Sequence, residues 1–199
     1  MNTTIASSVL GVALCFGSVV LVAITAPPAH HYPEGSLSDT ARLDRSRNDR
    51  YSRHLGAMSE PVLKPSQAGR VYRFLWLRSF HHPIAVRVDR DHVGARVVAV
   101  ELDGPEGYRP INLLKRRETA LSEQQADAFE RALSADGLWT IPSHDDRRDR
   151  QMIDGAEWVI EAATTQHRVI TRRSPRNDPA RAMGERFLAI AGLASEEVY

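Results

Sequence analysis

Residues 154–175 read DGAEWVIEAATTQHRVITRRSP and contain two apolar–polar alternations separated by a small polar break. A period of two is typical of β-strands, and the polar break between them predicts a hairpin turn. If the turn is centred between Thr164 and Thr165, Glu161 faces Arg168. Facing opposite charges stabilise a strand pair by about 0.2–1 kcal/mol. We therefore interpret the charges of this segment as pairing within a hairpin rather than as a binding surface.

Four runs that precede the hairpin also have strand composition. Residues 71–80 (VYRFLWLRSF) are aromatic and aliphatic, which predicts a strand buried on both faces. Residues 84–89 alternate between aliphatic and other side chains, which predicts a strand with one face in solvent. Residues 95–102 (ARVVAVEL) predict a third strand, and the more charged residues 113–121 (LLKRRETAL) suit a strand near the sheet edge.

Two helices are indicated by their terminal residues. Ser122 and Gln125 form a capping-box pattern at the start of an amphipathic segment, and Gly137 supplies the left-handed stop. Asp178 followed by Pro179 predicts the N-cap and first position of a final helix.

These signals predict an α+β domain over residues 70–199, in which two helices pack on one face of an antiparallel sheet of five or six strands. Residues 27–69 are rich in Pro, Ser, His, Arg and Asp and show no sustained period. Such a segment buries too little apolar surface to offset its chain entropy, so we expect a disordered linker with a span of roughly 35–40 Å.

The segment from Ile5 to Ala26 contains no charged residue. As a helix it would span roughly 33 Å, which matches a bilayer core of about 30 Å. Pro27 follows the best cleavage position, so residues 1–26 predict an uncleaved transmembrane anchor, with a cleaved signal segment as the alternative. Arginines between residues 42 and 53 weakly favour a cytoplasmic carboxyl side by the charge-bias rule.

Composition excludes several functions. The net charge of the 199-residue chain is +1, so no overall field attracts nucleic acid, and we expect no nucleic-acid partner. Cys15 is the single cysteine and lies in the apolar run, so the folded part has no disulfide, cysteine nucleophile or thiolate metal site. The chain contains no GxSxG, HExxH or phosphate-binding glycine motif, and we expect no cofactor.

Two polar segments remain as candidate interaction loops. Residues 143–155 (SHDDRRDRQMIDG) include His144, Asp145 and Asp146, which could bind a metal, but the neighbouring arginines favour a solvated loop without one. Tyr108 and Arg109 lie in a glycine-rich loop, where they could contact a ligand or cover the core.

Several stretches resemble a group of uncharacterised, mostly exported bacterial proteins with a DGAxW…RxSP pattern. The stretches are HPIAVRV (82–88), ELDGPEGYRP (101–110), GLWTIP (137–142), DGAEWVIEA (154–162) and HRVITRRSP (167–175). The resemblance implies an extracytoplasmic α+β domain and brings no known activity. The order of strands and helices is also similar, in layout alone, to that of the emfourin inhibitors of metalloproteases.

From these observations we expect a membrane-tethered, non-enzymatic interaction or accessory domain. It would be anchored in the inner membrane through residues 5–26, face the periplasm or exterior, and bind a protein partner that the sequence does not identify; cleavage of the signal would make it secreted. The export implied by the resemblance outweighs the charge-bias rule. The alternative is a protease inhibitor that presents residues 103–110 or 143–155 to an active-site cleft.

Overall fold

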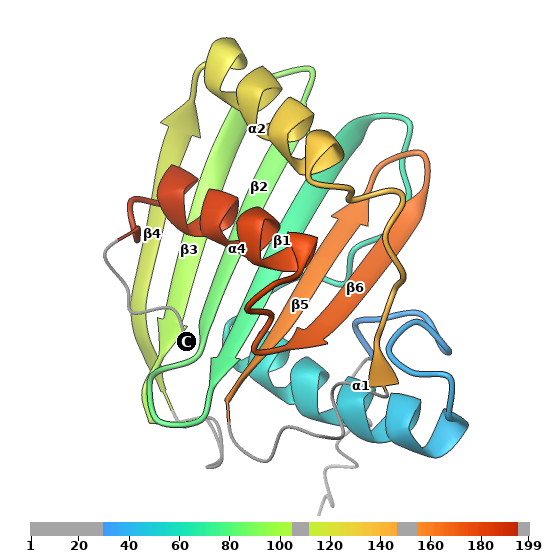
Figure 1. Ribbon diagram of the computed structural model, residues 1–199. Coiled ribbons are helices and arrows are strands. Elements are labelled where there is room, and N and C mark those ends of the chain that lie inside the picture. Colours follow the sequence, from blue (N-terminus) through green and yellow to red (C-terminus); the bar gives the residue numbers. More distant parts are fainter. Residues whose placement is uncertain (1–29, 105–111, 147–154, 195–199) are drawn as a thin grey trace, which may run out of the picture.

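The computed structural model describes residues 30–104, 112–146 and 155–194 (Figure 1). Its helices and strands, in chain order, are α1 (Ala41–Ala57), β1 (Gly69–Arg78), β2 (Ile84–Asp91), β3 (Ala95–Leu102), β4 (Leu113–Leu121), α2 (Glu123–Ala135), β5 (Ala156–Ala163), β6 (His167–Arg173) and α4 (Pro179–Ile190).

The six strands form one sheet in the order β4-β3-β2-β1-β5-β6. Every neighbouring pair is antiparallel, which confirms the predicted α+β class and places the charged strand β4 at one edge. The long strand β1 lies at the centre, between β2 and β5, and its residues from Tyr72 to Arg78 are all buried.

Helices α2 and α4 cover one face of the sheet, as predicted (Figure 1). Ser122 and Gln125 make the reciprocal capping-box bonds at the start of α2, and Asp178 caps α4 by accepting a hydrogen bond from the amide of Ala180. The first core lies beneath these helices, and in it the aromatic rings contact one another in stacked, tilted and edge-on pairs: Phe74, Trp76, Trp158, Phe129 and Phe187.

The opposite face of the sheet is covered by residues 30–68, which include α1 (Figure 1). The prediction of a disordered linker is therefore wrong for these residues, and the packed unit begins at residue 30 rather than at residue 70. Tyr51 and Leu55 of α1, and Met58 directly after it, project into a second core on this face.

Polar side chains explain why this segment packs despite its low apolar content. Asp44 accepts hydrogen bonds from the amides of Gly35 and Leu37, and the Arg47 guanidinium donates to the carbonyl of Leu37. Asn48 donates to the Tyr32 carbonyl at 2.8 Å. One side of α1 thus satisfies the backbone of the loop before it, which removes the cost of burying those peptide groups.

The predicted hairpin is present as β5 and β6, but its register differs from the prediction by one residue. Ala163 pairs with His167 across a three-residue loop, so Glu161 faces Val169 while Arg168 faces Ala162. A slip of one residue moves side chains to the opposite face. Glu161 and Arg168 consequently point away from each other, and Glu161 instead contacts Arg73 of β1 and His167 of β6.

Candidate functional site

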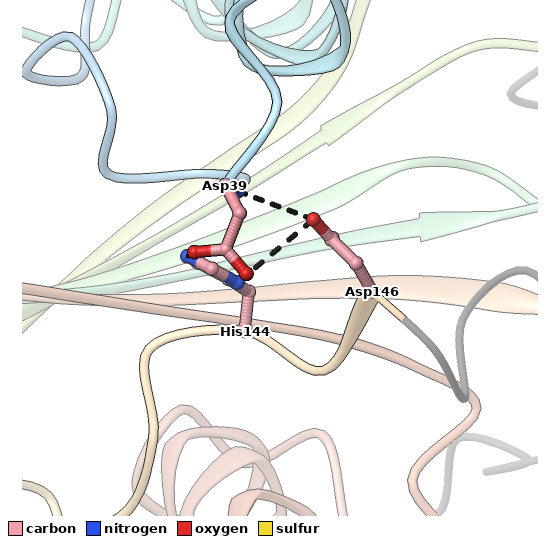
Figure 2. Close-up of side chains that lie close together, drawn as sticks. All are labelled: Asp39, His144 and Asp146. Atoms are coloured by element: carbon pink, nitrogen blue, oxygen red, sulfur yellow. Dashed lines mark hydrogen bonds and ion pairs between the residues drawn. The ribbon is translucent and has the colours of Figure 1, made fainter.

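The structure brings together two of the five predicted site residues and a third that the sequence analysis missed. His144 and Asp146 lie beside Asp39, and their potential ligand atoms are within 4.8 Å of one another (Figure 2). Asp145 is not a member of this cluster. Tyr108 and Arg109 lie outside the described residues.

The Asp146 carboxylate is fully engaged by residues from the N-terminal segment. Its Oδ2 accepts hydrogen bonds from the Ser38 hydroxyl at 2.6 Å and the Asp39 amide at 3.2 Å. Its Oδ1 accepts from Arg47 at 2.7 Å. Burial by itself would raise the pKa of this carboxyl, but the bonds from Ser38 and Arg47 outweigh it and lower the pKa.

This bonding favours a structural role over a metal site. A cation at the cluster would have to displace the Ser38 hydroxyl and would meet the Arg47 guanidinium, which repels it. His144 completes the cluster through a 3.5 Å contact between its Nε2 and the exposed Asp39 carboxylate. The three residues therefore join the start of α1 to the segment that precedes β5.

A second polar cluster is buried between the sheet and the N-terminal segment. Arg73 of β1 is fully buried, and it pairs with Glu161 and donates to the Pro61 carbonyl at 2.7 Å. Glu60 accepts a 2.8 Å hydrogen bond from Arg87 of β2, a residue that the sequence analysis placed on a solvent face. Residues 60 and 61 cover that face, so the prediction of an exposed face on β2 is wrong at Arg87.

Apolar side chains are exposed at one end of the sheet. Phe80 follows β1 and is 73% exposed, while Leu113 and Leu114 at the start of β4 are 50% and 54% exposed. Because β1 ends where β4 begins in this antiparallel order, all three residues lie at the same end of the sheet. Strand β3 ends and strand β5 begins at this end too.

The missed residue Asp39 had a detectable signal. Thr40 is the N-cap of α1, and Tyr51, Leu55 and Met58 recur at the three- and four-residue spacing of a helix. This pattern could have predicted a helix at residues 41–57. That Asp39 meets His144 could not have been predicted, since more than one hundred positions separate them along the chain.

Comparisons with known proteins find no match among protein-family models, curated proteins or solved structures. Within residues 30–104, 112–146 and 155–194, no helix has both the length and the apolar character needed to cross a membrane. The apolar run of residues 5–26 lies outside these ranges.

Proposed function

We propose that this chain is a membrane-tethered, extracytoplasmic accessory domain that binds a protein partner in or near the same membrane and has no catalytic activity. The observation that carries the proposal is that Phe80, just after β1, and Leu113 and Leu114, at the start of β4, are all exposed at one end of the sheet. Large apolar side chains that are exposed at one end of a domain can contact another protein.

The attachment of the domain supports a partner close to the membrane. Residues 27–29 alone separate the apolar run from His30, and the chain from His30 onward packs against the sheet. A long spacer would let the domain search a large volume, whereas this arrangement restricts it to the vicinity of its anchor.

The described polar clusters support binding rather than catalysis. A catalytic group needs a side chain that is available to a substrate, with its base or acid in reach. Asp146 and Arg73 instead make buried bonds that hold the N-terminal segment in place.

Photo-crosslinking in intact cells tests the proposal. A photoreactive amino acid at Phe80 of the full chain should give a discrete protein adduct, and Leu113→Asp with Leu114→Asp should abolish it. Val93 is the matched control, because it is 83% exposed but lies in the β2–β3 turn at the opposite end of the sheet. Labelling of lipid alone at Phe80, or equal protein adducts at both positions, would contradict a partner surface at this end.

Reporter fusions at Tyr199 test the orientation. An active alkaline phosphatase and a dark fluorescent protein are expected for an extracytoplasmic domain. The reverse result would place the domain in the cytoplasm.

A further inference from the structure

A cleft of about 730 Å³ beside α1 is lined chiefly by arginines. Six arginines and two carboxylates contribute to it, together with Leu43 and Ser46. The helix supplies most of this lining, and Glu157 of β5 and Arg173 of β6 supply the wall at the sheet.

Both carboxylates of the cleft are already engaged. Asp49 lies 2.9 Å from the ring of His30, and Glu157 forms an ion pair with Arg50. Although burial alone would raise the pKa of Glu157, the charge and hydrogen bond of Arg50 outweigh it and lower the pKa. The closest side-chain contacts of the two acids are thus with His30 and Arg50.

Three of those arginines have no acidic partner in the described part of the chain. Arg42, Arg45 and Arg53 are exposed and lie on α1 along the cleft. Some exposed arginines elsewhere, Arg96 and Arg186 among them, pair with carboxylates. The cleft thus concentrates uncompensated guanidinium groups, which bind phosphate oxygens through paired hydrogen bonds.

The position of the cleft indicates the source of the phosphate. His30, which contacts Asp49 inside the cleft lining, is four residues after Ala26. Four residues of extended chain reach at most roughly 14 Å. If residues 5–26 cross the bilayer, this distance keeps the cleft close enough for its arginines to reach the lipid headgroups, whose region extends several ångströms beyond the hydrocarbon core.

We propose that the α1 cleft binds the phosphate headgroup of an acidic phospholipid and so fixes the domain against the membrane surface. The proposal rests on the membrane anchor of the proposed function but not on the existence of a protein partner. A zwitterionic headgroup is disfavoured, since its ammonium group would meet the same arginines.

Native mass spectrometry of the full chain in a non-ionic detergent tests this assignment. Short-chain phosphatidylglycerol should bind at least tenfold more tightly than phosphatidylcholine of the same chain length. The variant with Arg42→Gln, Arg45→Gln and Arg53→Gln should bind phosphatidylglycerol about a hundredfold more weakly, since each basic residue near an anionic headgroup contributes about fivefold. The control variant with Lys115→Gln, Arg117→Gln and Arg131→Gln removes the same charge from exposed sites on β4 and α2 and should keep its affinity.

Equal loss in both triple variants, or no preference for phosphatidylglycerol, would overturn the site. If inorganic phosphate competes as strongly as the lipid does, the cleft binds free phosphate and the lipid assignment is overturned. Preferential binding of an oligonucleotide would overturn the lipid assignment as well. Because lipid binding is measured on purified chain, it is independent of the crosslinking result at Phe80. A chain found cleaved and soluble in cells would refute the anchor while leaving the affinity of the cleft measurable.

Discussion

Replacing Leu55 with alanine tests whether the N-terminal segment is an integral layer of the fold. Leu55 is fully buried, and it belongs to the second core together with Leu75 and Leu77 of β1. Truncation of a fully buried leucine removes its transfer free energy and leaves a cavity, which costs about 2–5 kcal/mol. Since the sheet on one side and the helix backbone on the other restrict collapse of the cavity, we expect a loss within this range.

Urea unfolding of the full chain in non-ionic detergent, followed by circular dichroism and tryptophan fluorescence, measures the effect. Leu133→Ala, which truncates a fully buried leucine of α2 in the first core, should cost a comparable amount. Leu114→Ala removes a 54% exposed side chain and should change the free energy of unfolding by less than about 0.5 kcal/mol. If Leu55→Ala behaves like Leu114→Ala in both signals, residues 30–68 do not form a layer of the fold and the reasoning fails.

Further predictions concern packing, pH and activity. Gly184→Ala should destabilise the chain by about 1–3 kcal/mol, because the new Cβ would lie 2.1 Å from the Trp158 ring. Gly56→Ala is the control: its Cβ meets nothing within 4 Å, and it should stabilise α1 by up to about 1 kcal/mol. Thermal unfolding compares the two variants, and equal effects on stability would contradict the contact between Gly184 and Trp158. Burial lowers the pKa of His54, so the imidazole binds a proton less readily in the folded state than in the unfolded state. The free energy of unfolding should therefore fall as the pH drops below about 6.5. Urea titrations at a series of pH values measure this dependence, and His54→Gln should lack the contribution of His54. Asp146→Asn should destabilise the chain by about 1–3 kcal/mol, because it weakens the bonds of this side chain to Ser38 and Arg47 in the N-terminal segment. If limited proteolysis cleaves that segment at the same rate in the variant, Asp146 does not hold the segment in place. Stoichiometric mixing with thermolysin-type and serine proteases should leave their activity unchanged, and tight inhibition would instead support the inhibitor alternative.

Local signals in the sequence were sufficient for the sheet and for the two helices on its first face. The capping box of Ser122, the N-cap Asp178 and the left-handed Gly137 each depend on residues a few positions apart, and all three are present. Strands β1 to β4 follow from composition and alternation, which report burial on a pleated surface. Such features depend mainly on neighbouring residues, so a single sequence can show them.

The N-terminal layer depended on contacts that are distant along the chain. The helix period of Tyr51, Leu55 and Met58 was visible, but the surrounding residues are polar and predicted a spacer. Their polar side chains are buried because each finds a partner, as Arg47 does in Asp146, ninety-nine positions away. Composition reports how much apolar surface a segment can bury, and it does not report whether buried polar groups will be satisfied.

The features of the candidate sites also divide into those that the sequence determined and those that the tertiary structure decided. The sequence by itself determined that the chain carries a charge-free run at residues 5–26, a near-neutral balance of charge and the residue types of a sheet with two capped helices. The tertiary structure alone decided that Asp146 joins two segments, that Glu161 pairs with Arg73 rather than with Arg168, and that the arginines of α1 line one cleft. The physical reason is that a one-residue change in a hairpin loop moves each charge to the other face of the sheet, and ion pairs form between residues that the fold, not the sequence order, makes neighbours.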